Sequence, residues 1–220
     1  MTCAEDLTRM EERLTTGESN RTSRKIKIYS GGVSAKIREA DFALAKIQEL
    51  LDYSDDFRRP QDQDYTVEDL IYFYVDAFFA FLYSNFDIIS HVVNQKMHLD
   101  IPEDKVKFDS VKKKLDTDHP GTPIQLLYQR LSKSRHFKNL RNYRNCSTHR
   151  RRIMMKQDAH NISVTSEYSQ TGPIRSVLRL LCDDPLELNP KTKQKRELEK
   201  YTSTILRWSK AQISQISNTL

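Results

Sequence analysis

Apolar residues recur every three or four positions along most of this chain, which is the spacing of one face of an α-helix. One such stripe predicts a helix over residues 33–52 and consists of Val33, Ile37, Ala40, Leu44, Ile47 and Leu51. A second predicts a helix over residues 191–218 and includes Leu198, Tyr201, Ile205, Trp208, Ile213 and Ile216. The periodicity indicates an all-α protein, built as an up-and-down helical bundle.

The strongest helical segment covers residues 66–97, where Thr66 and Asp69 have the spacing of a capping box. It is apolar around most of its circumference, but Asp76 and Asp87 interrupt it. Because ionisable groups are costly inside a bilayer, the segment is expected to be a buried bundle helix and no membrane contact is predicted. At 100° per residue the polar side chains fall on one narrow stripe, formed by Asp76, Tyr83, Asp87 and Asn94. This stripe either touches solvent or offers a carboxylate to a cation on a neighbouring helix.

The segments around this helix are less regular. Residues 103–116 are charged and weakly helical, and a turn follows at residues 118–121. Thr122 as a cap, Pro123 in the first turn and Gln125 predict a helix start, and the pattern continues to about residue 151. Residues 152–188 change in character and predict a small irregular or β insertion, as two short strands or extended loops.

The N-terminal part is set apart by its composition. Residues 2–15 predict a short helix, in which Thr2 and Glu5 form a capping box. Residues 16–32 are polar and contain glycines, which is typical of a linker or loop, and the KIKIY sequence within them could pair as a strand. The predicted organisation is an N-terminal helix and linker over residues 1–32 and a bundle domain over residues 33–220.

Composition narrows the possible chemistry. Only 5 Gly and 7 Pro in 220 residues argue against a turn-rich all-β fold. The 3 cysteines form no CxxC pair and no zinc-ligand spacing with the 6 histidines, so no metal or other cofactor is predicted. The chain shows no secretory signal and is expected to be reduced and cytoplasmic. A net charge of +6 is compatible with a polyanionic partner such as RNA.

The residues with the most suggestive chemistry lie together in the sequence RNYRNCSTHRRR, at positions 141–152. On a helix, Arg141, Asn145 and His149 share one face. Arg144 lies five positions before His149 and about 140° around the helix, from where a flexible guanidinium can still reach the same cleft.

These residue types suit RNA cleavage without a metal. The reaction needs a proton acceptor near the ribose 2′-hydroxyl, a donor near the leaving oxygen, and fixed positive charge beside the phosphate. Histidine is the residue type that titrates closest to neutral pH, so His149 could take either proton role, and the guanidinium of an arginine such as Arg144 matches two phosphate oxygens. The Asn145 amide can hold the histidine or the substrate. One histidine is too few for separate acid and base roles, so either the site is dimeric or water takes one role.

The R-N-x-x-x-H motif of Arg144, Asn145 and His149, late in a helix and preceded by an apolar helix with an embedded Asp, resembles the HEPN superfamily. The resemblance covers about residues 33–151. It implies a helical bundle that acts as a metal-independent ribonuclease, with an active site formed where two motifs meet across a dimer or across two domains. For this chain we expect a homodimer. Several members act as toxins or in phage defence, and a regulatory protein partner is therefore also an expectation.

By the same resemblance, Arg144 and His149 are catalytic, Asn145 is the polar residue that follows the motif arginine, and Asp87 or Asp76 orients the arginine. Members paired with a nucleotidyltransferase continue to a tyrosine shortly after the histidine, but here Arg150, Arg151 and Arg152 follow.

The basic residues around the motif allow two interpretations. Arg141, Arg150 and Arg151 are candidates for binding the RNA phosphates. Basic residues at the end of a helix also complement its dipole without any ligand. The alternative function is therefore a non-catalytic helical module that binds RNA, a nucleotide or a protein partner, and a purely structural bundle is a third interpretation.

Overall fold

The computed structural model describes residues 15, 20–52, 65–149, 155–160, 175–180 and 196–220. Its helices, in chain order, are α2 (Asn20–Asp52), α3 (Val67–Lys96), the 3₁₀ helix η1 (Glu103–Lys105), α4 (Phe108–Asp118), α5 (Pro123–Lys133), α6 (Arg135–His149) and α7 (Leu198–Thr219). Three short strands precede α7 in this part of the chain: β1 (Met155–His160), β2 (Arg175–Leu180) and β3 (Arg196–Glu197).

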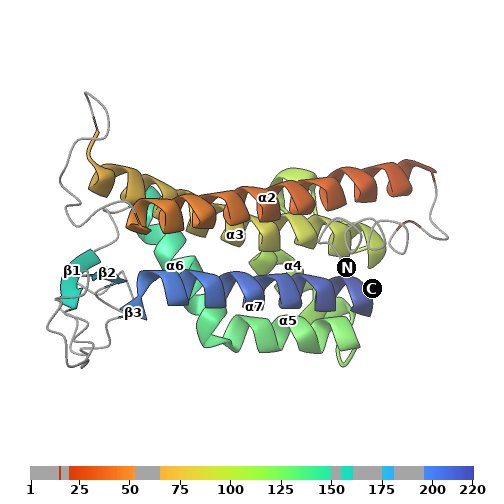
Figure 1. The fold of residues 1–220 in the computed structure, drawn as a ribbon. Helices are drawn as coiled ribbons and strands as arrows, with labels where there is room; N and C mark the ends of the chain where they lie inside the picture. The colour runs from red at the N-terminus through yellow and green to blue at the C-terminus, as the bar shows by residue number, and fades with distance from the viewer. Residues whose placement is uncertain (1–14, 16–19, 53–64, 150–154, 161–174, 181–195) are drawn as a thin grey trace, which may run out of the picture.

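The helices form an up-and-down bundle. Figure 1 shows α2 and α3 side by side in opposite directions, with α7 and α5 running antiparallel to each other below them. The strands lie at one end of the bundle, where α7 begins. The predicted all-α bundle with a small β insertion before the last helix is confirmed.

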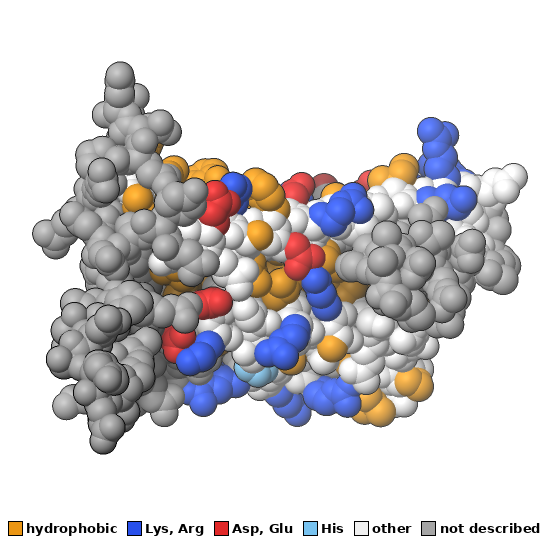
Figure 2. Space-filling model, in the orientation of Figure 1, with side chains coloured by type: hydrophobic (Ala, Val, Ile, Leu, Met, Phe, Trp, Pro, Cys, Tyr) orange, Lys and Arg blue, Asp and Glu red, His pale blue; other side chains and the backbone are white. Residues whose placement is uncertain are grey.

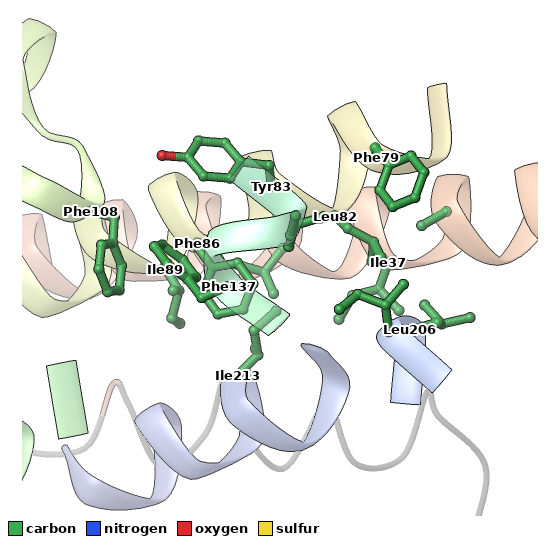
Figure 3. Packing of buried hydrophobic residues seen from close by; sticks show 14 of the residues in the cluster. Ile37, Phe79, Leu82, Tyr83, Phe86, Ile89, Phe108, Phe137, Leu206 and Ile213 are labelled. Atoms are coloured by element: carbon green, nitrogen blue, oxygen red, sulfur yellow. The ribbon is translucent and has the colours of Figure 1, made fainter. Parts of the chain in front are cut away.

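Aromatic side chains from five helices, α3 to α7, fill the centre of the bundle. Phe86 of α3 packs edge-on against Phe137 of α6, with ring centroids 5.1 Å apart, and lies 5.8 Å from the ring of Trp208 of α7. Phe108, at the start of α4, stacks on Tyr128 of α5 at 4.7 Å. Figure 3 shows these core residues of α3 and α6 together with Ile213 and Leu206 of α7. Burial of this apolar surface is what holds the helices in their mutual positions.

The helix starts that the sequence indicated most clearly are confirmed. The Thr66 hydroxyl accepts the backbone N–H of Asp69, and the Asp69 carboxylate accepts the N–H of Thr66, which completes a capping box. The Thr122 hydroxyl accepts the N–H of Gln125, and Pro123 occupies the first turn of α5. No described helix is long and apolar enough to span a membrane.

The prediction of a linker or strand over residues 16–32 is wrong for residues 20–32, which belong to α2. Ile26 is fully buried in the core, so this part of the helix is held by the bundle. Gly31 and Gly32 lie in the middle of the helix. A β-carbon on Gly32 would meet Cγ2 of Ile88 on α3 at 3.3 Å, so glycine here allows α2 and α3 to approach closely. The predicted helix over residues 2–15 lies outside the described residues, except residue 15.

We expect the two glycines to respond differently to alanine. Gly31→Ala should raise the free energy of unfolding by about 0.5–1 kcal/mol, because alanine is the better helix former and nothing lies within 4 Å of the added carbon. Gly32→Ala should gain less or lose stability, because its β-carbon crowds Ile88. Urea unfolding of both variants measures the difference. A destabilised Gly31→Ala protein would contradict a continuous α2.

The predicted single helix over residues 122–151 is interrupted. Ser134 has extended backbone, with φ −60° and ψ 133°, and separates α5 from α6. The physical reason is the position of the apolar residues. On one straight helix Tyr128 and Phe137 would point about 180° apart. The break turns α6 so that both side chains enter the same core.

The β insertion is only partly where the sequence placed it. β1 pairs antiparallel with β2, from Met155 opposite Leu180 to His160 opposite Arg175. β1 and β2 both lie within the predicted insertion over residues 152–188, and the rest of that range lies outside the described residues. β3 pairs with β2, and α7 starts at Leu198, so the predicted helix start near residue 191 is wrong for residues 196–197.

Candidate functional site

The second half of α6 carries the motif and is docked on α3 by aromatic packing. Tyr143 stacks on Phe79 of α3, with centroids 4.4 Å apart and planes 11° from parallel. Phe137, Leu140 and Tyr143 are all buried, and they fix the face of α6 that meets α3. This packing places Arg144 beside the middle of α3.

Three contacts orient the Arg144 side chain. Its guanidinium carbon lies 4.5 Å from the centre of the Tyr83 ring, in a cation–π arrangement. Nη2 lies 4.0 Å from Oδ2 of Asp87, and Nη1 donates a hydrogen bond to Oδ1 of Asn145 at 3.1 Å. The Arg144 side chain keeps 29% of its surface exposed, so a ligand can still approach it.

Asp87 is held in place by a second helix. Its Oδ1 accepts the backbone N–H of Phe108 at 3.0 Å, in the first turn of α4. The residue at the N-cap position of α4 is Lys107, whose side chain has no acceptor, so Asp87 performs this capping role from α3. Burial raises the pKa of the Asp87 carboxyl, and the Phe108 N–H and Arg144 oppose this only in part. The carboxylate therefore anchors α4 through one oxygen and faces the Arg144 guanidinium with the other.

Arg141 contacts α4 and the Phe137 ring. Its Nη2 lies 2.6 Å from Oδ1 of Asp109 on α4, and its guanidinium carbon lies 5.2 Å from the Phe137 ring centre. The Asp109 side chain is 64% exposed, and such an exposed pair contributes little to stability. An anionic ligand could therefore compete with Asp109 for Arg141 at little cost in stability.

The structure distinguishes the two candidate orienting carboxylates. Asp87 contacts Arg144, whereas Asp76 lies about three turns earlier on α3, roughly 16 Å along the helix. On the predicted polar stripe of α3, Asp87 therefore faces α6. Tyr83 and Asn94, which belong to the same stripe, are buried and do not face solvent. The Asn94 side chain exchanges two hydrogen bonds with the backbone of Ile101, which is a structural role.

The remaining motif residues are only partly described. His149 is the last residue of α6, one turn after Asn145, and its side chain lies outside the described part of the structure. Arg150 and Arg151 lie outside the described residues. The structure thus brings together Arg144, Asn145 and Asp87, and the position of the imidazole relative to them stays a prediction.

The roles of two residues in this cluster were not predicted from the sequence. Tyr83 was placed on the polar stripe with Asp87, but not as the aromatic surface under Arg144. Asp109 pairs with Arg141, and no local pattern relates these residues because 32 positions separate them. Among the described residues, no group of three or more His, Cys, Asp or Glu side chains could hold a metal ion.

The fold is a helical bundle, and the described part of the motif lies where α6 meets α3. The model of the Cthe2314-like HEPN family matches residues 17–216, and this chain belongs to that family. Membership suggests a nuclease or other RNA-related function. Comparison with curated proteins and with solved structures gave no match.

Proposed function

We propose that this protein is an endoribonuclease that cleaves RNA without a metal ion. A general base removes the proton of a ribose 2′-hydroxyl, and the 2′-oxygen attacks the adjacent phosphorus. The 5′-oxygen of the next nucleotide leaves with a proton from a general acid. The products are one RNA end with a 2′,3′-cyclic phosphate and another with a 5′-hydroxyl.

The observation that carries this proposal is the positioning of Arg144. A guanidinium that Asp87, Asn145 and Tyr83 fix in direction, and that is still partly exposed, suits stabilisation of the negative charge that builds on the phosphate. His149 would transfer protons, and Asn145 would position the substrate or the guanidinium. Arg141, Arg150 and Arg151 would bind neighbouring phosphates.

We further propose that the protein acts as a homodimer. Each chain supplies one motif histidine, while the reaction needs both a proton acceptor and a proton donor. A dimer in which two motifs face each other supplies both, with the second group coming from the partner's His149. The toxin or phage-defence setting and a regulatory protein partner stay predictions that rest on the resemblance.

The test is an RNA cleavage assay in the presence of EDTA. We expect the purified chain to cleave single-stranded or loop RNA, and its products to carry 2′,3′-cyclic phosphate and 5′-hydroxyl ends. A substrate with 2′-deoxyribose on the 5′ side of the scissile bond should stay intact, because it lacks the attacking hydroxyl. Cleavage of that deoxy substrate, or no cleavage of RNA at any pH near neutral, would rule out this mechanism.

A second candidate is a non-catalytic module that binds RNA, a nucleotide or a protein partner. The observation in its favour is that both arginines of the described cluster already lie beside carboxylates, Arg144 beside Asp87 and Arg141 beside Asp109. Under this alternative the cluster stabilises the junction of α3, α4 and α6. Labelled RNA would then shift in mobility without being cut.

A further inference from the structure

A polar pocket lies between α5 and α7, on a part of the bundle that the motif does not include. Its volume is about 320 Å³, within the range of small-ligand sites. Trp208 and Leu131 provide its apolar surface. Its polar lining consists of Arg130, Ser134, Gln212 and Gln215.

Trp208 presents a fixed aromatic surface to this pocket. Its ring centroid lies 5.8 Å from that of Phe86 in the core and 5.4 Å from that of His136 on α6. The side chain is only partly buried, so part of the indole faces the pocket. A rigid, half-buried aromatic ring is the platform on which unpaired nucleobases stack.

The polar side chains of the pocket have no partner among the residues that the structure describes. Within the described part of the chain, the side chains of Arg130, Gln212 and Gln215 make no hydrogen bond or ion pair. Arg141 and Arg144, by contrast, each lie beside a carboxylate. Amide groups can bond to both donors and acceptors on a base edge, and a guanidinium matches phosphate oxygens.

The charge around the pocket favours an anionic ligand. α5 and α6 contain no Asp or Glu, and their basic residues are Arg130, Lys133, Arg135, Lys138, Arg141 and Arg144. Figure 2 shows Lys and Arg side chains gathered over the lower part of one face, where Figure 1 places α5 and α7. Ser134 at the pocket and Arg144 are ten residues apart, about 15 Å along α6. One basic helix therefore connects the pocket with the proposed cleavage site.

We infer that this pocket binds an unpaired nucleobase and its adjacent phosphate, as a second RNA contact outside the cleavage site. The base stacks on Trp208, the amides of Gln212 and Gln215 bond to its edge, and Arg130 binds the phosphate. This inference deepens the proposed function by adding a substrate-binding subsite, but binding at the pocket is measurable without cleavage.

Trp208 is the only tryptophan of the chain and reports on the pocket directly. The probe is a single-stranded oligonucleotide with 2′-fluoro ribose, which lacks the attacking hydroxyl and is therefore not cleaved. We expect it to quench the tryptophan fluorescence of the full chain. Arg130→Gln combined with Gln212→Ala should weaken binding roughly five- to hundredfold, because it removes the guanidinium that binds the phosphate and one amide that bonds to the base edge.

Arg207→Gln is the matched control. Arg207 is exposed on α7 next to Trp208 but does not line the pocket, and its replacement removes the same charge as Arg130→Gln. This control should change affinity by no more than about threefold. Equal affinities of the Arg207→Gln protein and the double variant, or binding with unchanged fluorescence of Trp208, would overturn the inference.

Two further ligands identify what the pocket recognises. Quenching by adenosine monophosphate that disappears in the double variant supports the pocket and shows that one nucleotide is sufficient. Quenching by the oligonucleotide alone also supports it and identifies RNA as the source of the base. Equal quenching by a poly-glutamate peptide would instead assign the pocket to acidic proteins and overturn the inference. If the oligonucleotide binds at the pocket but the chain cleaves no RNA, the proposed function is refuted and the inferred binding site is still supported.

Discussion

Replacing His149 with alanine is expected to reduce metal-free RNA cleavage by roughly 10²- to 10⁴-fold, the usual contribution of a positioned acid or base. Arg144→Ala should cost roughly 10²- to 10³-fold, because it removes the charge that stabilises the transition state. Single-turnover cleavage rates in EDTA measure both effects. The far-ultraviolet circular dichroism should not change, because His149 ends α6 and Arg144 is partly exposed.

The matched controls for these two variants lie elsewhere on the surface. Arg38→Gln removes an exposed guanidinium from α2, and His98→Asn removes an exposed imidazole while tolerating the φ of 49° at this position. Both should cleave RNA at the rate of the unmodified chain. Full activity of the His149→Ala and Arg144→Ala proteins would eliminate the motif as the active site.

The His149→Ala chain also tests the dimeric site. If each site needs His149 from both subunits, only unmodified homodimers remain active after the two proteins are mixed equally and allowed to exchange. About one quarter of the activity should then remain, instead of the half expected for independent sites in a two-fold dimer. A value of one half would show that each chain acts with its own histidine.

The parts of the fold that were predictable from sequence are those that neighbouring residues determine. Thr66 with Asp69, and Thr122 with Gln125, form their caps within one helical turn, so their spacing alone located two helix starts. The glycines at positions 31 and 32 misled the same local reasoning. Both glycines lie inside α2, and the close approach of Ile88 on α3, which leaves little room for a side chain at Gly32, is not visible from the neighbouring residues.

The candidate site also combines features that neighbouring residues determine with features that depend on other helices. Of the two interpretations of the stripe on α3, the one with a carboxylate beside a cation of another helix agrees with the 4.0 Å distance between Asp87 Oδ2 and Arg144 Nη2, and the motif had drawn attention to Arg144. The choice of Asp87 over Asp76 required the relative position of α3 and α6, which Tyr143 sets by stacking on Phe79. That Asp87 also caps α4 could not be predicted, because 21 positions separate it from Phe108.

The double role of Asp87 leads to a prediction in which stability and activity separate. Asp87→Asn keeps an oxygen that can accept the Phe108 N–H but removes the charge beside Arg144. We expect its unfolding free energy to change by less than about 1 kcal/mol, because the cap persists. Its cleavage rate should fall roughly 10- to 100-fold, equivalent to about 1.4–2.7 kcal/mol of lost transition-state stabilisation.

Asp87→Ala removes both the cap and the charge. It should lose about 1–2 kcal/mol of stability, as measured by urea unfolding, together with the same loss of cleavage rate as the asparagine variant. If Asp87→Asn instead cleaved RNA at the full rate, Asp87 would serve only to anchor α4, and Arg144 would not depend on it for orientation.

The pH dependence of cleavage separates a positioning role of Asp87 from a structural one. Burial raises the pKa of this carboxyl, so Asp87 is protonated at a higher pH than an exposed aspartate. Its charged form is the one that orients Arg144, so the rate of the unmodified chain should fall as the pH drops through this raised pKa. The Asp87→Asn protein has no charge to lose at this position, and its profile should lack that acidic decline. Identical pH profiles for the two proteins would leave Asp87 with the α4 cap as its only role.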